Sequence, residues 1–379
     1  MNDDTSTVRP SRRLWALARR GTILVTAVAA AGALVAAAPA PSARSTTQGT
    51  SQGTSHVDAA AGTALRSPVG AVVRSEVRGV GARNILLPST RVTARWSRAI
   101  NTTRKGVVNY AYWRWYAPYT NVPTGWTGST RWCNPGRASS SSHTATLNSI
   151  NFVRSLNGLA SVGFGPLLNW RAQRSALMMS ANTTLSHYPT TSWRCYSAVG
   201  DTTAAKSNLA LALPDITSGH IVDMYMDDAG AGNEAVGHRR WLLYPYTTRM
   251  GNGSTETANA LTVVGPTAWW RPNPRWTSWP SSGYFPSPLE PRGRWSLTSG
   301  IAGEDFSRAI VRVWHNGRRI YPRKLAVHTG YGMPTVAWQM PWERSRLGTY
   351  RVSVVRITRP GVRHFYGHSY TVNVFRPTR

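Results

Sequence analysis

Acidic and histidine side chains that could bind a metal ion or move protons gather in one part of the chain, around residues 215–253. Three of the nine histidines, His187, His220 and His238, lie in this part or just before it. Six acids fall within 34 residues, although the whole chain has a formal net charge of +29: Asp201, Asp215, Asp223, Asp227, Asp228 and Glu234. Imidazoles and carboxylates that share a cleft can hold a divalent cation or exchange protons near neutral pH.

The spacing of these residues does not specify a reaction by itself. The chain has no His-Glu-x-x-His, no Gly-x-Ser-x-Gly and no glycine-rich phosphate loop. We expect His220 to lie at the surface. We also expect Arg239 and Arg240, which follow His238, to be solvated or paired with the nearby acids.

Helices must position most of this stretch. Apolar residues at every third position predict a helix that starts near Ser142 and stops at Gly158. A second helix is predicted to begin at Pro166, since proline suits the first turn. A third is predicted from Ser218 to Gly230.

The amino-acid composition of the chain changes beyond Gly265. Prolines and tryptophans alternate through residues 269–289 and indicate a stiff, extended connector. Residues 290–379 contain alternating apolar runs with Asn316-Gly317 between two of them, a strong hairpin signal. We predict a small antiparallel β-sandwich there.

The first 130 residues divide into three segments. Arginines, an uncharged run and an Ala38-Pro39-Ala40 cleavage site predict a signal peptide over residues 1–40; an uncleaved membrane anchor is the alternative. Residues 41–106 have the composition of a low-complexity tether. Residues 107–130 are rich in aromatic side chains, and their alternation predicts extended structure. We expect these rings to pack onto the next domain; a stacking platform for sugars or bases is the alternative.

The basic charge belongs to the mature protein. Residues 1–40 carry five arginines and two aspartates, so their removal leaves +26, and lysine occurs only at 105, 206 and 324. Such a field attracts polyanions in general, including anionic lipid and cell-wall polymer. We expect no specific nucleic acid partner, and we expect a monomer.

The chain has two cysteines, Cys133 and Cys195. In an exported protein such a pair favours a disulfide, because the compartment is oxidising and no other cysteine competes. These two thiols alone are two ligands short of a metal site.

Five short motifs follow one another in the middle of the chain: Leu185-Ser186-His187, Ser207-Asn208-Leu209-Ala210, Tyr225-Met226-Asp227-Asp228, Gly237-His238-Arg239-Arg240-Trp241-Leu242-Leu243 and Met250-Gly251-Asn252-Gly253. Together they resemble the CAP (SCP-domain) superfamily of cysteine-rich secretory proteins, venom allergens and plant pathogenesis-related proteins, most of all its bacterial branch. The resemblance covers about residues 131–268. It implies an α+β chain in which a three-layer α-β-α sandwich with a central cleft precedes the C-terminal β-sandwich, and it implies export.

The resemblance also implies a cleft with two histidines and two acids. His187 and His238 match the histidines and the metal ligands, with Zn²⁺ or another divalent cation as the possible cofactor, and Asp228 matches one acid. Ser207 stands where the other acid, a glutamate, is expected, and Glu234 is its possible substitute.

Loss of that acid favours a secreted, non-catalytic binder of lipid, wall polymer or a divalent cation. Two alternatives stay open: a metal-dependent hydrolase of peptides or wall material, and a structural or adhesive wall protein. Which residues would be catalytic is not specified by the sequence.

Overall fold

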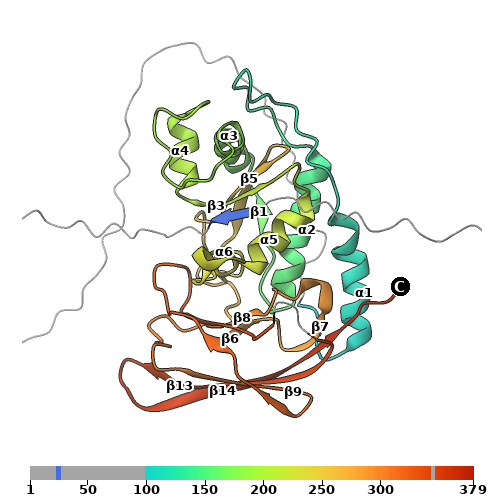
Figure 1. Ribbon diagram of the computed structural model, residues 1–379, viewed down its shortest axis with the longest axis vertical. Helices are drawn as coiled ribbons and strands as arrows, with labels where there is room; N and C mark the ends of the chain where they lie inside the picture. The colour runs from blue at the N-terminus through green and yellow to red at the C-terminus, as the bar shows by residue number, and fades with distance from the viewer. Residues whose placement is uncertain (1–22, 27–98, 343–345) are drawn as a thin grey trace, which may run out of the picture. The chain divides into compact units, whose positions relative to one another are not determined.

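The computed structural model describes residues 23–26, 99–342 and 346–379 (Figure 1). These residues belong to one of the two units into which the chain divides. Most of the predicted signal peptide and tether lie outside the described residues. None of the described helices is long and apolar enough to cross a membrane.

A five-stranded sheet in the order β1-β3-β5-β4-β2 forms the middle layer of the first half. Its strands are β1 (Ile23–Thr26), β2 (Gly163–Phe164), β3 (Ser207–Ala212), β4 (Arg249–Ser254) and β5 (Ala258–Thr262). Strands β1, β3, β5 and β4 are antiparallel, and β2 runs parallel to β4. Strand β1 lies within the predicted signal peptide, so cleavage as predicted would leave β3 at the edge.

Helices cover both faces of this sheet, which confirms the predicted three-layer arrangement (Figure 1). Leu209 and Leu211 of β3 pack with the helices α3 (Pro166–Asn182) and α4 (Ala198–Ala204). Ala210 and Ala212 face the other way, because side chains alternate along a strand. That other face is covered by α2 (Ser140–Ser155), α5 (Ser218–Asp227) and the short α6 (Gly237–Leu242).

The helix boundaries follow local chemistry. The hydroxyl of Ser139 caps α2 by accepting a hydrogen bond from the Ser142 amide at 3.1 Å. Helix α3 begins at Pro166, as predicted. Helix α5 ends at Asp227 and not at Gly230, because Asp228 takes a left-handed conformation with a φ of 48°.

The extended structure predicted over residues 107–130 is wrong for the first part of that segment. Residues Lys105–Trp115 form helix α1, and a 3-10 turn, η1 (Ala117–Tyr119), follows it. The buried residues Val108, Ala111 and Tyr112 stand at positions i, i+3 and i+4, which lie on one face of a helix. Because aromatic residues occur throughout this segment, the helical repeat of its buried positions could not be recognised from the sequence.

A β-sandwich follows, as predicted. One sheet has the order β10-β9-β13-β14-β7 and the other β11-β12-β8-β6. The strands are β6 (Trp276–Trp279), β7 (Gly283–Pro286), β8 (Arg294–Ser299), β9 (Ile310–His315), β10 (Arg318–Ile320), β11 (Arg323–Lys324), β12 (Thr335–Gln339), β13 (Gly348–Arg359) and β14 (Val362–Phe375), with the turns η2 (Ala231–Asn233) and η3 (Ser287–Leu289) outside the sheets. Asn316 and Gly317, both at positive φ, turn the β9–β10 hairpin.

The predicted connector, residues 269–289, is partly incorporated into the sandwich. Strands β6 and β7 come from it and pair with β8 and β14. Trp279 and Phe285 are buried, with ring centroids 4.9 Å apart. The proline content indicated a stiff spacer, whereas burial of these rings draws the segment into the sheets.

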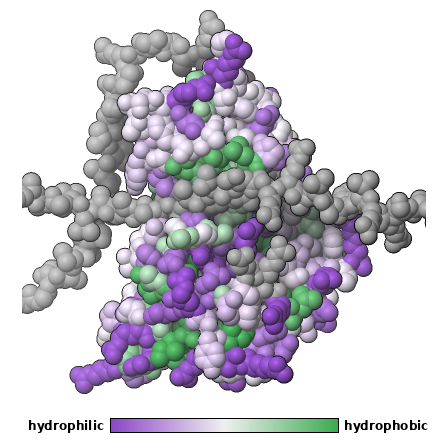
Figure 2. Space-filling view, in the orientation of Figure 1, coloured by the Kyte–Doolittle hydropathy of each residue, from purple (hydrophilic) through white to green (hydrophobic). Residues whose placement is uncertain are grey.

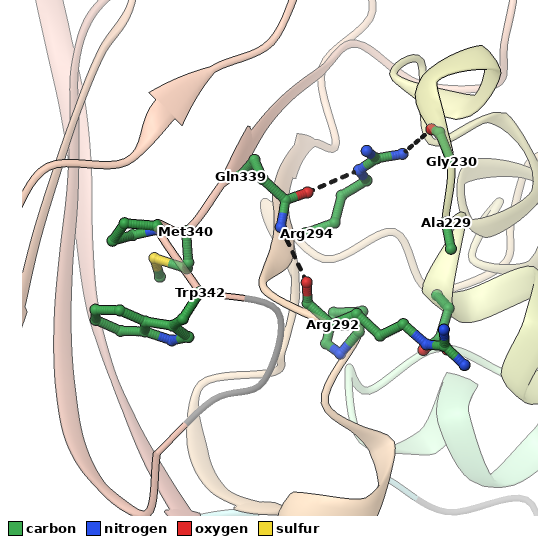
Figure 3. Close-up of a pocket in the computed structure, with 10 residues that line it drawn as sticks. Ala229, Gly230, Arg292, Arg294, Gln339, Met340 and Trp342 are labelled. Carbon is green, nitrogen blue, oxygen red and sulfur yellow. Dashed lines mark hydrogen bonds and ion pairs between the residues drawn. The ribbon is translucent and has the colours of Figure 1, made fainter.

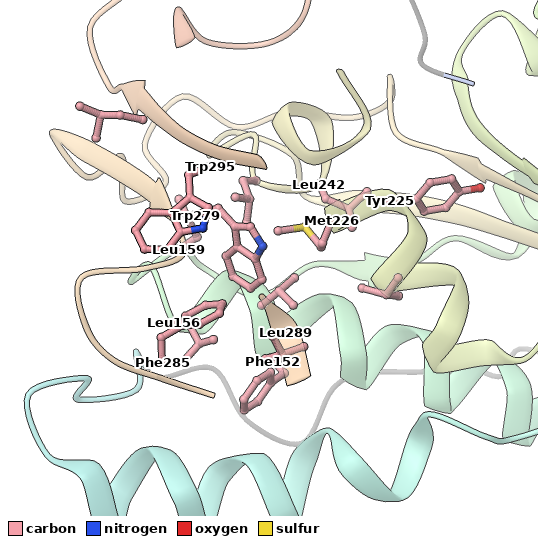
Figure 4. Close-up of a cluster of buried hydrophobic side chains, with 14 of the residues drawn as sticks. Phe152, Leu156, Leu159, Tyr225, Met226, Leu242, Trp279, Phe285, Leu289 and Trp295 are labelled. Atoms are coloured by element: carbon pink, nitrogen blue, oxygen red, sulfur yellow. The ribbon is translucent and has the colours of Figure 1, made fainter. Parts of the chain in front are cut away.

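The sandwich and the helical half share one hydrophobic core. Figure 4 shows Trp279 and Trp295 of the sandwich beside Leu156, Met226 and Leu242 of the helices, with further buried rings around them. The predicted disulfide is confirmed between Cys133 and Cys195, and it ties the segment before α2 to the loop before α4. The described unit is thus held by a continuous core and one covalent link.

Candidate functional site

His238 and Asp228 form a fully buried pair. Nδ1 of His238 donates to Oδ1 of Asp228 at 2.5 Å, and both side chains have 0% exposure. The ring of Tyr225 stacks on His238 with centroids 5.2 Å apart. Nε2 of His238 is buried and makes no hydrogen bond within the described residues.

The second carboxylate oxygen of Asp228 and its backbone carbonyl oxygen also accept hydrogen bonds. Its Oδ2 accepts from the Arg239 amide at 3.0 Å. Its carbonyl oxygen accepts from Arg294 of β8 at 2.5 Å. Asp228 therefore connects α5, α6 and the sandwich, and this structural use accounts for its burial without a ligand.

Arg239 and Arg240 are buried, which corrects the expectation that they are solvated or paired with acids. Arg239 donates to the carbonyl oxygen of Met226 at 2.7 Å and to Oγ of Ser296 at 3.0 Å. Arg240 donates to the carbonyl oxygen of Met333 at 2.9 Å. Burial lowers the pKa of both guanidinium groups to about 10. The two arginines thus join the helical half to the sandwich.

His187 and Ser207 lie at the end of α4. Nδ1 of His187 donates to the carbonyl oxygen of Ala204 at 2.9 Å. The Ser207 hydroxyl donates to the carbonyl oxygen of Thr203 at 2.7 Å. Since Ser207 has the same parity along β3 as Leu209, its side chain belongs to the α3 and α4 face of the sheet.

Glu234 lies apart from both pairs. It forms an ion pair with Arg323 of β11 at 3.2 Å, and its side chain is 29% exposed. The structure therefore brings His238 and Asp228 together, places His187 and Ser207 around one helix end, and engages Glu234 with the sandwich.

These residues do not fit the two-histidine, two-acid metal set. Within residues 23–26, 99–342 and 346–379, no three His, Cys, Asp or Glu side chains lie close enough to hold a metal ion. Ser207 offers a hydroxyl already bonded to backbone, and His238 is closed off from solvent. Metal binding at this place stays a prediction.

A polar pocket of about 460 Å³ opens where α5 meets the sandwich. Figure 3 shows Arg294 extended between Gly230 and Gln339, with Arg292 alongside. Arg292 also forms an ion pair with Asp227 at 3.2 Å. Guanidinium groups line this pocket, but carbonyl and carboxylate partners already engage them.

A second pocket, of about 500 Å³, lies along α5 and includes His220, Asp223 and Asp227. Burial raises the pKa of Asp227 to about 7, although Arg292 and Arg239 lower it. Burial raises the pKa of Asp223 well above its usual value, and Asp227 adds to this shift. The Tyr116 hydroxyl donates to Asp223. The arrangement can hold and release protons near neutral pH.

His220 was expected at the surface, but the structure places it in a partly buried position. This burial lowers the pKa of its ring. The pairing of Asp223 with Tyr116 was not foreseen. The spacing of Asp223 and Asp227 by four residues is a signal in the sequence that they share one face of a helix. Nothing in the sequence indicates that α1 supplies the tyrosine.

Residues 147–265 match the model of the cysteine-rich secretory protein family, CAP. The chain contains a CAP domain. The match runs from within α2 to just after β5, inside the span of residues 131–268 that the motifs indicated. It includes His187, Ser207 and the His238–Asp228 pair.

No curated protein matches this chain. Among solved structures, the methionine-rich copper resistance protein PcoC from Escherichia coli is 15% identical with a TM-score of 0.21, and the match covers 26% of this chain and 94% of that protein. CopC from Methylosinus trichosporium OB3b is 14% identical with a TM-score of 0.22, and the shares are 27% and 93%. Likenesses this weak carry no argument.

Proposed function

We propose that this CAP-domain protein is an exported, non-catalytic binding protein that attaches to anionic polymers of the cell envelope through its arginine-rich surface. The CAP domain and the sandwich share one hydrophobic core, so they present that surface together. The proposal keeps the family assignment and adds to it a mode of binding that depends on charge.

The observation that carries the proposal is the scarcity of carboxylate partners for the arginines. Within the described residues, three arginines form ion pairs with acids: Arg275, Arg292 and Arg323. Several others lie over aromatic rings, among them Arg131 over Trp132 at 4.8 Å and Arg174 over Trp170 at 3.5 Å. Guanidinium groups held in this way keep their forked N–H donors available to carboxylate or phosphate.

The visible surface agrees with this picture. Figure 2 shows purple hydrophilic areas interleaved with green hydrophobic ones over much of the described part. A surface that mixes hydrophilic with hydrophobic side chains suits a polymer that has both charged groups and a less polar backbone.

The CAP site supports binding over turnover. The residues that match the family cleft are bonded internally: His238 to Asp228, and Ser207 to Thr203. A general acid or base must come within hydrogen-bond reach of its substrate. His238, Asp228 and Ser207 have no exposure, whereas His187, which bonds to the Ala204 carbonyl, is partly exposed.

The test is retention of the purified protein on a panel of matrices: polygalacturonate, inorganic polyphosphate, anionic vesicles and neutral dextran. We expect retention on anionic matrices and none on dextran. Equal retention on dextran would overturn the proposal. Release of new fragments from peptide or wall preparations during the same incubations would overturn its non-catalytic part.

A further inference from the structure

The outer face of the sandwich sheet β10-β9-β13-β14 is rich in arginine. Val311 and Val313 of β9 point into the sandwich, so Arg312 and Trp314 point outward. On β13, Val352 is buried and its neighbour Arg351 is exposed. We call this the outer sheet face.

A first cluster on the outer sheet face centres on Trp314. Arg319 of β10 and Arg351 of β13 are its direct cross-strand neighbours on either side. Their guanidinium carbons lie 4.5 Å and 5.5 Å from the indole centroid. Contact with the ring restricts both guanidinium groups, so less side-chain entropy is lost when they bind an anion.

A second cluster centres on Phe365, whose ring is 42% exposed. Arg308 and Arg356 lie over this ring at 5.0 Å and 5.2 Å. Phe365 has the same parity along β14 as the exposed Thr371, so it belongs to the outer sheet face. The face therefore has two arginine–aromatic–arginine clusters.

Between the clusters lie the hydroxyl groups of Ser353 and Ser369, and Arg312 of β9 stands directly opposite Ser353. Ser369 donates to Ser353 at 2.9 Å, and beyond the first cluster Thr349 donates to Asn373 at 2.8 Å. Strands β9, β10, β13 and β14 contain no aspartate or glutamate. Arg351 of the first cluster and Arg356 of the second lie five positions apart on β13, which is at most about 17 Å at about 3.3 Å per residue.

We propose that the outer sheet face binds an anionic polysaccharide, laid along the sheet so that its acidic groups meet the two clusters. This rests on the proposed function and names its site and its ligand class. The length favours an extended polymer over a small anion. The serine hydroxyls between the clusters, and the Thr349 hydroxyl and Asn373 amide beyond the first cluster, can bond to sugar hydroxyls. Neither a bare polyphosphate nor a bilayer surface presents hydroxyl groups in that arrangement.

The test compares two double variants in calorimetric titrations with polygalacturonate. Arg319→Gln/Arg351→Gln removes the first cluster, and Arg171→Gln/Arg249→Gln removes the same charge from exposed positions of α3 and β4. We expect about a tenfold or greater loss of affinity in the first and less than about threefold in the second, as two lost charged contacts predict. Equal losses in both would overturn the site.

Two further measurements test the role of Trp314 and the class of the ligand. Trp314→Phe should keep most of the affinity and Trp314→Ala should lose it, while the far-ultraviolet circular dichroism of both variants stays unchanged. Binding of polyphosphate as tight as that of polygalacturonate at equal charge would overturn the ligand class. The same holds if the first double variant loses its binding to anionic vesicles but keeps its binding to polygalacturonate. If the wild type binds none of these polyanions, the proposed function itself fails.

Discussion

Asp228 satisfies two buried donors at once, the His238 ring and the Arg239 amide. Asp228→Ala leaves both donors unpaired in a closed site and places alanine at a φ of 48°. We expect a loss of about 2–4 kcal/mol in the free energy of unfolding. Asp228→Asn should lose less, because asparagine tolerates this conformation and keeps one acceptor.

Denaturant unfolding followed by circular dichroism measures this effect. Asp215→Ala is the matched control, since Asp215 is exposed, and its change should stay within about 0.5 kcal/mol. A loss for Asp228→Ala no larger than for this control would contradict the structural use of the pair.

His143 on α2 gives the protein a dependence on pH. Burial lowers the pKa of its ring from 6.5 to about 4, and Nδ1 accepts a hydrogen bond from Asn252 at 3.2 Å. The unfolded chain therefore binds the proton more readily than the folded one, so stability falls as the pH drops from about 6.5 to about 4. The effect amounts to at most about 3 kcal/mol.

The measurement is the unfolding free energy of the wild type and of His143→Gln across this window. The variant should lack that part of the pH dependence, so the two curves should converge at low pH. Parallel curves would show that His143 does not titrate in this way.

At the scale of elements, the glycines of β4 set how closely α3 approaches the sheet. A Cβ on Gly253 would lie 2.2 Å from the backbone of Ala172 and Gln173, whereas one on Gly163 of β2 would meet nothing within 4 Å. We expect Gly253→Ala to destabilise by about 1–3 kcal/mol or more and Gly163→Ala to be nearly neutral. Thermal unfolding of the two variants tests this, and similar melting temperatures would contradict it.

The sequence predicts elements well where one local signal decides them. Pro166 marks the start of α3, and Asn316-Gly317 marks the β9–β10 hairpin. It predicts poorly where distant packing decides, as for α1 and for the strands drawn from the proline-rich connector. The candidate site shows the same limit, because burial of Arg239 depends on Ser296, 57 positions away.

At the scale of the whole molecule, Arg239 and Arg240 make the CAP domain and the sandwich depend on each other. Arg239→Met removes donors from Met226 and Ser296. We expect a loss of about 2–4 kcal/mol and one cooperative transition. Arg171→Met, on an exposed position, is the control. Two separate transitions in the wild type would show that the halves unfold independently.

The central claim is that charge on an arginine-rich surface holds this protein to anionic polymer. The most direct measurement is the affinity of the wild type for polygalacturonate as sodium chloride rises from about 50 mM to about 1 M, over which the Debye length falls from more than 10 Å to about 3 Å. The account predicts a steep and continuous loss of affinity. Affinity that stays constant over this range would contradict it.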